Sequence, residues 1–366
     1  MAVRDGRKAV RFVLVGGFLG AGKTTTLCEL GKRLAATGLR VGVITNDQAD
    51  DLVDSGWARL SNLPVAEIAG GCFCCKFDDL VQSCEELLTA IDPDVILAEP
   101  VGSCTDLSAT VIQPLRKFYG EWFTVLPYAV LVDPERVEST LRGPGADGDV
   151  GYLFRKQLEE ADLIVLSKLD LLPPAESDRL QGLLRAVFPE TPVVAFSART
   201  GAGFDDWWRQ VQAGEVVGGR ILDIDYDTYA DAEAALGWLN ATVALSAPRG
   251  FDGSALASDL LQRVRAGAAA VGAEIGHVKL LLNASEGTLR AGFVTAASEL
   301  DQTGSLSGAV CAATLTFNAR VAMPPEDLAA LVRQALGAAA AAAGATADVT
   351  RLQSFRPGRP NPTHRF

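Results

Sequence analysis

The sequence reads Gly17-Phe18-Leu19-Gly20-Ala21-Gly22-Lys23-Thr24 directly after the apolar run at residues 12–15. This spacing is that of a P-loop, in which glycines let backbone N–H groups face the phosphates of a nucleotide. Lys23 would neutralise the β and γ oxygens, and the Thr24 hydroxyl would reach a Mg²⁺ ion. From Leu27 onward leucines recur at helical spacing, which predicts a helix whose N-terminus faces the anion. The residues expected to bind the nucleotide here are Gly17, Gly20, Ala21, Gly22, Lys23, Thr24 and Thr25.

The chain has 366 residues, of which 48% are hydrophobic, and a formal net charge of −12. We expect one large core and a second, smaller one at this length. The negative charge argues against nucleic acid or an anionic membrane as the main partner. Basic residues followed by an apolar stretch give the N-terminus the look of a short secretion signal, but the P-loop overlaps that stretch. Since no apolar run approaches the roughly 18 residues of a membrane-spanning helix, we expect a cytoplasmic protein.

Short apolar runs alternate with helical patterns between residues 10 and 208. These runs lie at residues 41–44, 95–98, 129–132, 163–166 and 193–196. Near-continuous apolar strands separated by helices predict a mostly parallel sheet, covered on both faces, with ligands at the carboxyl ends of the strands. We therefore expect an α/β fold, with a P-loop domain of the nucleoside-triphosphatase type over residues 1–213.

A second unit is expected after a passage rich in Gly and Asp at residues 214–236, taken as a linker. The predicted order is a strand near 239–245, a helix near 255–271, strands near 278–282, 289–294 and 312–321, and a helix at 325–343. This order predicts a smaller α+β domain over residues 237–353. Residues 354–366 form a tail rich in Pro and Arg that cannot hold a regular helix. We expect this tail to lie over the surface or to be disordered.

The motif Glu99-Pro100-Val101-Gly102 follows an apolar run where P-loop proteins carry a second acid near the metal. The Glu99 carboxylate would hold Mg²⁺ through water, and the Gly102 amide would sense the γ-phosphate. A plain surface acid is the alternative for Glu99. A first switch is expected after residues 41–44, where we favour Asp47 as the metal-linked or water-orienting acid over Asp50 and Asp51.

The motif Ser167-Lys168-Leu169-Asp170 is similar to the guanine signature Asn-Lys-x-Asp. Both Asp170 oxygens can accept hydrogen bonds from the N1–H and N2–H groups of guanine, and the Lys168 stem can lie over the ring. Adenine has no such donor pair. Ser197 and Ala198 match the further element that approaches the guanine carbonyl. Because Ser167 replaces Asn, fewer hydrogen bonds brace the pocket, so GTP is preferred with ATP as the alternative.

A cysteine motif, Gly70-Gly71-Cys72-Phe73-Cys74-Cys75, follows a short strand expected at residues 65–68. It is too tight for a regular disulfide framework. The sulfurs of Cys72, Cys74 and Cys75 suit Zn²⁺, and three thiolates leave one tetrahedral position open. Thiols that merely pack are the alternative. The other cysteines are isolated in the sequence and are expected to be small core or surface residues rather than ligands: Cys28, Cys84, Cys104 and Cys311.

Together the four motifs, at residues 17–25, 70–75, 99–102 and 167–170, resemble those of the CobW-like GTPases, relatives of the nickel-insertion GTPases. The resemblance spans most of the chain. It implies a P-loop GTPase that acts as a metallochaperone or metal-insertion factor. In such proteins the Cys-x-Cys-Cys thiols bind Zn²⁺ or Co²⁺, and GTP turnover gates the transfer of the ion to a client. No arginine finger is identifiable, so intrinsic hydrolysis should be slow.

The sequence differs from the pattern of the CobW-like family in two respects. The chain has only His277 and His364 in place of a His-rich tract, so we expect one ion per chain. The first switch begins Asn46-Asp47-Gln48 where most relatives have Asn-Glu-Phe-Gly, which indicates a divergent branch. A client metalloprotein and a corrinoid or methyl-transfer system both stay open, as does a homo-oligomer. Two other functions compete: a GTP-dependent switch without metal, and an ATP-using small-molecule kinase.

Overall fold

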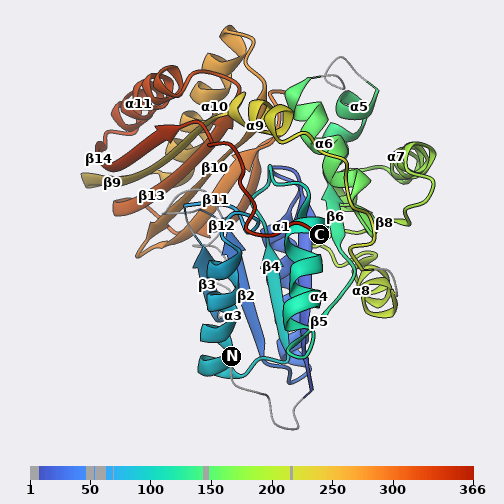
Figure 1. Cartoon of the computed structure of the whole chain (residues 1–366). Helices are drawn as coiled ribbons and strands as arrows, with labels where there is room; N and C mark the ends of the chain where they lie inside the picture. Colours follow the sequence, from blue (N-terminus) through green and yellow to red (C-terminus); the bar gives the residue numbers. More distant parts are fainter. Residues whose placement is uncertain (1–7, 47–52, 54–62, 69, 143–147, 215–216) are drawn as a thin grey trace. The chain divides into compact units, whose positions relative to one another are not determined.

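The computed structural model describes residues 8–46, 53, 63–68, 70–142, 148–214 and 217–366. These residues divide into two units (Figure 1). Unit 1 contains the described residues up to Ala232 other than Val53, together with Arg359–Phe366. Unit 2 contains Val53 and Glu233–Gly358. Each unit is built on its own sheet.

Unit 1 has a sheet with the strand order β3-β2-β4-β1-β6-β7-β8, and β5 pairs with β1. The paired strands of this sheet all run parallel within the described residues. Strands β2, β4, β6 and β7 are buried along their whole length, which explains their near-continuous apolar sequence. The predicted mostly parallel sheet is confirmed. Its strands are β1 Val10–Gly17, β2 Val41–Asn46, β3 Val65–Ile68, β4 Val95–Glu99, β5 Phe123–Val125, β6 Ala129–Val132, β7 Leu163–Leu166 and β8 Val193–Ala195.

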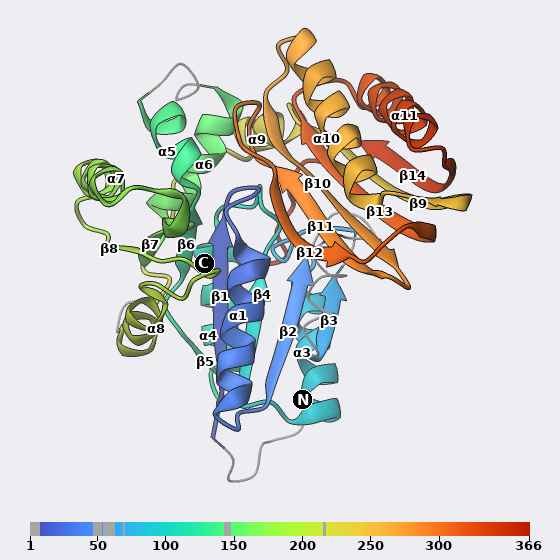
Figure 2. The ribbon, with the colours of Figure 1, turned by 180° about the vertical axis from the view of Figure 1, so that it is seen from behind.

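Helices cover both faces of this sheet (Figures 1 and 2). On one face α1 and α8 share a core with the central strands, in which Leu30, Trp207 and Val13 are buried together. On the other face lie α3 and α4, in front of the sheet in Figure 1. The helical elements of unit 1 are α1 Lys23–Ala36, α3 Phe77–Ile91, the π-helical turn η1 Ser108–Ile112, α4 Gln113–Tyr119, α5 Pro134–Leu141, α6 Asp149–Glu159, the short turn η2 Leu169–Leu171, α7 Pro174–Val187, α8 Phe204–Ala213 and α9 Tyr226–Ala234, which runs two residues into unit 2. Helix α9 lies in the passage that the sequence analysis takes as a linker.

Unit 2 has an antiparallel sheet with the order β12-β11-β10-β13-β9-β14. Helices α10 and α11 share a core with this sheet, which confirms the smaller α+β domain. The predicted strands and helices are all present. Two further strands, β12 and β14, lie at the edges of the sheet, and much of each is exposed. The elements are β9 Gly237–Phe251, α10 Gly253–Ala270, β10 Ile275–Ala284, β11 Gly287–Phe293, β12 Asp301–Leu306, β13 Val310–Val321, α11 Pro325–Ala342 and β14 Thr346–Phe355.

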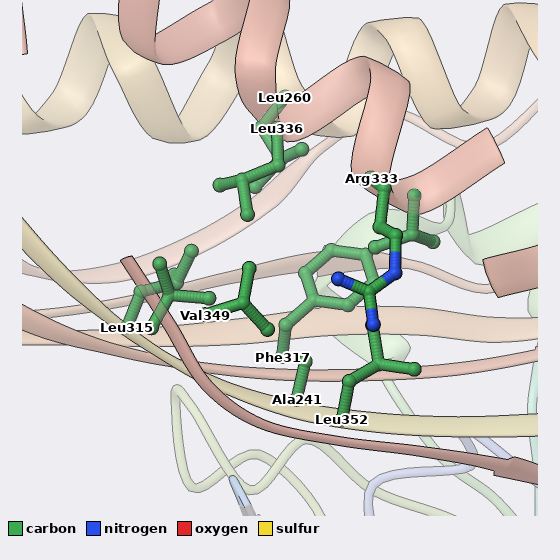
Figure 3. Close-up of a pocket in the computed structure, with 10 residues that line it drawn as sticks. Ala241, Leu260, Leu315, Phe317, Arg333, Leu336, Val349 and Leu352 are labelled. Atoms are coloured by element: carbon green, nitrogen blue, oxygen red, sulfur yellow. The ribbon is translucent and has the colours of Figure 1, made fainter. Parts of the chain in front are cut away.

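A small cavity lies in the core of unit 2 (Figure 3). Leu260 of α10 and Leu336 of α11 line it from the helices, and Phe317 lines it from the sheet. Its volume of about 10 Å³ leaves room for about one water molecule, so we assign no ligand to it. Within the described ranges, no helix is both long enough and apolar enough to cross a membrane.

Candidate nucleotide site and thiol cluster

The P-loop joins β1 to α1 through glycines in the left-handed region, with φ of 131° at Gly17, 83° at Gly20 and 92° at Gly22. A side chain at Gly17 would collide with the carbonyl oxygen of Leu131 on the neighbouring strand. Gly22 is the N-cap of α1, which begins at Lys23. The first N–H groups of a helix have no partner inside the helix, so this loop presents donors to an anion. The backbone therefore fits a bound phosphate chain.

Two oxygen-bearing side chains meet beside the P-loop. The Thr24 hydroxyl lies 2.9 and 3.0 Å from the two carboxylate oxygens of Glu99. Thr24 is the second residue of α1, and Glu99 is the last residue of β4, the strand that pairs with β1. Both side chains are buried. Hydroxyl and carboxylate oxygens are ligands that Mg²⁺ prefers, so the pair fits a Mg²⁺ ion. The fold thus brings together two residues that the sequence analysis proposes for one site.

The loop after β4, residues 100–107, is called the switch loop below. A Cβ atom built on Gly102 would lie 3.0 Å from Lys23 Nζ and 2.7 Å from Leu19 Cδ2, so the backbone of this loop closely approaches the P-loop. Lys23 Nζ itself donates to the carbonyl oxygen of Gly17 at 2.7 Å. The backbone of Gly102 therefore lies where it would contact a γ-phosphate bound beside Lys23.

Helix α6 holds the switch loop from the other side. The Gln157 side-chain amide donates to the carbonyl oxygens of Gly102 and Cys104, both at 2.9 Å. Glu160, which follows α6, accepts the Ser108 N–H at 3.0 Å. Burial raises the pKa of Glu160 to about 8, well above the usual value for a carboxyl group. Neither anchor was predicted from the sequence, because a Gln within a helix and a Glu just after it carry no motif.

The predicted base-reading residues lie after β7 and β8. The Ser167 hydroxyl lies within donating distance of two carbonyl oxygens, that of Ala21 in the P-loop at 2.9 Å and that of Val132 at 3.0 Å. Ser167 therefore braces the P-loop against β6 although it is shorter than Asn. The Ser197 hydroxyl donates to Asp170 Oδ1 at 2.6 Å. Ala198 follows it and is half-buried.

Lys168 has a partner that the sequence analysis missed. Its ammonium lies 2.6 Å from Oδ2 of Asp133, a side chain only 2% exposed. Asp133 also caps α5 by accepting the Glu135 N–H at 2.9 Å. Lys168 itself adopts φ of 55°, so the backbone of this motif is tightly turned. Asp133 directly follows β6, and this position after a buried strand is the sequence signal that points to it.

The three thiols of the cysteine motif converge. Cys72 Sγ lies 2.8 Å from Cys74 Sγ and 3.5 Å from Cys75 Sγ, and the Cys74 and Cys75 sulfurs are 3.7 Å apart. Cys72 and Cys74 are buried, and Cys75 is half-buried. In a tetrahedral zinc site with Zn–S bonds of about 2.3 Å the sulfurs are roughly 3.8 Å apart. The set fits such an ion once the Cys72 to Cys74 separation widens by about 1 Å.

Asn46, the last residue of β2, holds the cysteine motif in place. Its amide donates to the carbonyl oxygens of Ile68 at 3.0 Å and Gly71 at 2.7 Å, and its carbonyl oxygen accepts the Phe73 N–H at 3.0 Å. Asn46 therefore links the first-switch region to the thiols. The acids expected in that switch lie outside the described residues: Asp47, Asp50 and Asp51.

A fourth thiol joins these three. Cys104 of the switch loop makes hydrogen-bonding contacts with the sulfurs of Cys72 and Cys74, so it is not isolated, but it is buried as the prediction of a core residue requires. We call Cys72, Cys74, Cys75 and Cys104 the thiol cluster. Hydrogen bonds from Cys104, and then from Cys74 and Cys75, lower the pKa of the Cys72 thiol. The contact with Cys72 raises the pKa of Cys75 to about 11. Since a metal binds thiolates, its binding would release the remaining protons and strengthen as pH rises.

The segment Arg359–Phe366 belongs to unit 1 and lies against the cysteine motif (Figure 1). The Asn361 N–H donates to Cys75 Sγ at 3.2 Å, and the Thr363 N–H donates to the Cys74 carbonyl oxygen at 2.9 Å. This part of the predicted tail therefore lies over the surface, one of the two expected outcomes. It covers the most exposed member of the thiol cluster.

Side chains of this segment anchor it on both sides. Arg365 lies 2.8 Å from Oδ2 of Asp106, a carboxylate that is 1% exposed on the switch loop. The His364 ring lies 5.2 Å from the Phe77 ring, just after the cysteine motif. Lys117 Nζ of α4 lies 3.6 Å from the centre of the Phe366 ring.

We expect Arg365→Ala to speed alkylation of Cys75 by about tenfold, because loss of a charge-assisted hydrogen bond costs roughly 1.5–3 kcal/mol and loosens the segment. Residue-resolved mass spectrometry after timed exposure to iodoacetamide would measure the rate. Arg359→Ala is the matched control, since Arg359 pairs with Asp227, which is highly exposed. Equal rates in the two variants would contradict a covering role for this segment.

Comparison with known proteins also indicates a nucleotide-binding domain, in agreement with the geometry of the P-loop. Residues 11–195 match the family model described as CobW/HypB/UreG, nucleotide-binding domain. The zinc chaperone CobW of Sinorhizobium sp is 31% identical over 190 residues, which cover 43% of this chain and 51% of that protein. The zinc chaperone YeiR of Escherichia coli (strain K12) is 29% identical over 175 residues, covering 46% and 49%. The chain thus spans about half the length of these curated relatives.

Among solved structures, the Zn(II)-bound YjiA GTPase from E. coli is similar over 90% of this chain and 99% of that chain, with 16% identity and a TM-score of 0.36. The family match covers the P-loop, the thiol cluster, Glu99 and the motif at residues 167–170, and accounts for half of the chain. The resemblance predicted from these motifs is confirmed. The chain belongs, through its nucleotide-binding domain, to the CobW/HypB/UreG family.

Proposed function

We propose that this protein is a GTP-hydrolysing metal-delivery factor that transfers a thiolate-bound divalent ion to a client. One observation carries the proposal: the switch loop contacts both candidate sites. Gly102 lies against Lys23 of the P-loop, and Cys104, two residues later, contacts Cys72 and Cys74. A change at the γ-phosphate that moves Gly102 would therefore also move Cys104, two residues later, and so reach the thiols.

Different residues of unit 1 are proposed to bind the phosphates, the Mg²⁺ ion, the guanine base and the ion to be delivered. Lys23 and the P-loop glycines hold the phosphates, Thr24 and Glu99 hold Mg²⁺, and the loops carrying Lys168 and Asp170 read guanine. GTP and Mg²⁺ supply the phosphoryl-transfer chemistry when bound. Asp47, which lies outside the described residues, is proposed as the metal-linked or water-orienting acid. Cys72, Cys74 and Cys75 hold the ion to be delivered.

Zinc is the first ion to test, with cobalt second. Two relatives are named zinc chaperones, and thiolate sulfur suits Zn²⁺ in tetrahedral geometry. The client is a metalloprotein or a corrinoid or methyl-transfer system. The alternative is a GTP-dependent switch that activates a partner enzyme without carrying metal.

The test is linkage between the two sites. Zinc affinity is measured by chelator competition in reducing buffer, with the protein loaded with GDP or with a non-hydrolysable GTP analogue. We expect the two affinities to differ by at least about fivefold, and zinc to change the analogue's affinity by the same factor. Cys74→Ala should remove zinc binding and leave nucleotide binding intact. Equal zinc affinities in the two nucleotide states would favour the switch without metal, and tighter binding of ATP would favour the kinase.

A further inference from the structure

Residues 359–366, called the covering segment below, bind unit 1 through their main chain. Three of their N–H groups donate hydrogen bonds, and the pairs are Asn361 to Cys75 Sγ at 3.2 Å, Thr363 to the Cys74 carbonyl oxygen at 2.9 Å and Phe366 to the Ala109 carbonyl oxygen at 3.1 Å. Recognition through main-chain hydrogen bonds is a common way for a protein surface to hold an extended peptide. The covering segment is therefore held as a bound peptide would be.

Asp106 of the switch loop gives this surface a specific charge. Its carboxylate is 1% exposed, and Arg365 Nε of the covering segment lies 2.8 Å from its Oδ2. The Tyr226 hydroxyl donates to the same oxygen at 2.6 Å. The Asp106 backbone adopts φ of 63°, a conformation that costs energy for a residue with a side chain and that clusters at switch regions and ligand clamps. A buried carboxylate needs a partner, so the surface requires a cation at this place.

Aromatic rings extend the surface beyond Asp106. The His364 ring lies 5.2 Å from the Phe77 ring and 5.1 Å from the Phe118 ring, and Phe366 lies 5.5 Å from Phe118. The Phe118 and Phe366 side chains are nevertheless 49% and 42% exposed. Aromatic side chains are enriched at protein interfaces, so this pair of half-exposed rings fits a contact with another protein.

We propose that the covering segment occupies a docking site for the client, and that an extended client segment of the same chemistry takes its place during delivery. This inference rests on the proposed function, which requires a recipient for the ion. Cys75 is half-buried whereas Cys72 and Cys74 are buried, so the ion is most easily handed over at Cys75. The Asn361 N–H lies on that sulfur, and a client ligand would take the place of Asn361.

The acceptors under the covering segment define the chemistry of the client segment. Departure of the covering segment removes the donors bound to the carbonyl oxygens of Cys74 and Ala109, and the cation bound to Asp106. Buried acceptors without donors are unfavourable, so the exchange is easiest when the client supplies equivalent groups. We therefore expect an extended client segment with free backbone N–H groups, an Arg or Lys opposite Asp106 and an aromatic side chain against Phe118.

The first experiment uses the metal-free protein, with a fluorescent peptide of the sequence of residues 361–366, capped at both ends, as the probe. Binding to wild type should be weak, because the covering segment competes as an intramolecular ligand. Arg365→Ala loosens that segment and leaves Asp106 in place, so the peptide should bind at least about tenfold more tightly. Arg359→Ala is the matched control and should behave as wild type, since Arg359 pairs with Asp227, which is 78% exposed.

A second variant and a second peptide make this result specific. Thr363→Pro removes the N–H that the Cys74 carbonyl oxygen accepts, so it should also raise the affinity for the peptide. A peptide with Glu in place of Arg365 should bind none of these proteins, because it places a like charge against Asp106. If neither variant binds the first peptide more tightly than wild type does, the covering segment is a fixed part of unit 1 and the inference is wrong.

A third measurement uses only the wild-type protein. The first peptide is made with Cys in place of Asn361 and supplied as its mixed disulfide with thionitrobenzoate. Once it docks in the register of the covering segment, the Cys75 thiolate attacks the peptide sulfur, a new disulfide forms and thionitrobenzoate leaves with the electron pair. Mass spectrometry should find Cys75 modified at least about tenfold faster than by the same peptide with Glu in place of Arg365.

Cys311 is the internal control in this measurement, because it is exposed on β13 and should react equally with both peptides. Equal rates of the two peptides at Cys75 would overturn the inference. A wild-type dimer that the first peptide dissociates would also overturn it, because the occupant would then be the covering segment of a second copy.

Failure of this inference is distinct from failure of the proposed function. The linkage between zinc and nucleotide is measured without any peptide, so the delivery function stands if zinc affinity depends on the nucleotide while no peptide docks. Equal zinc affinities in the two nucleotide states, with the peptide still bound, would reject delivery of the ion and with it the assignment of the occupant as a client.

Discussion

Lys23→Ala is expected to lower kcat for GTP hydrolysis by at least about 10²-fold, because removal of one preorganised donor from developing transition-state charge costs about that much. The Lys23 ammonium lies over the P-loop, within 2.7 Å of the Gly17 carbonyl oxygen and 3.4 Å of the Phe18 carbonyl oxygen. The same side chain is in close approach to Gly102 of the switch loop. Its loss should therefore weaken both catalysis and the signal to the thiol cluster.

Single-turnover phosphate release separates the chemical step from nucleotide binding in this variant. Lys32→Ala is the matched control, because Lys32 lies on the same helix, α1, and is exposed. The control should hydrolyse GTP at the wild-type rate. A Lys23→Ala rate within a few-fold of wild type, at saturating GTP, would mean that this loop is not where the γ-phosphate is cleaved.

The fold was predictable wherever sequence and burial are tightly coupled. The strands of the parallel sheet are buried on both faces, so their apolar runs are visible without any partner. The edge strands β12 and β14 escaped prediction for the opposite reason. Strand β12 is exposed along almost its whole length and reads Asp-Gln-Thr-Gly-Ser-Leu, which carries no apolar alternation. Pairing with β11, which is a tertiary contact, makes it a strand.

The candidate site divides in the same way. The P-loop and the cysteine motif are local, because each places its functional atoms within a few residues, and both were visible in the sequence. Cys104, Asn46 and Asp133 act through residues that are distant along the chain and brought close by strand order. Single side chains of this kind have no spacing rule. Only their position at the carboxyl end of a buried strand or in the loop that follows it could have singled them out.

Asp170→Asn is expected to weaken GTP binding by about 10²-fold and to strengthen binding of xanthosine triphosphate by a comparable factor. Guanine presents two donors, N1–H and N2–H, to the Asp170 carboxylate, and hydrogen bonds to a charged group contribute about 1.5–3 kcal/mol each. An amide replaces one acceptor with a donor, which opposes the N2–H group but matches the carbonyl oxygen of xanthine at the same position.

The surroundings of Asp170 make this exchange of specificity a sharp test. The Ser197 hydroxyl, 0% exposed, donates to Asp170 Oδ1, so in the variant it favours the orientation with the amide oxygen toward Ser197 and the amide nitrogen toward the base. Asp178→Asn, an exposed change on α7, is the control and should alter neither affinity. Fluorescence titration with labelled nucleotides measures all three proteins. Unchanged GTP affinity in Asp170→Asn would remove the motif at residues 167–170 from base recognition, and with it the reason to prefer GTP over ATP. A gain for xanthosine triphosphate would show that this carboxylate reads the edge of the base despite Ser167, because only a residue in direct contact with that edge can reverse the preference.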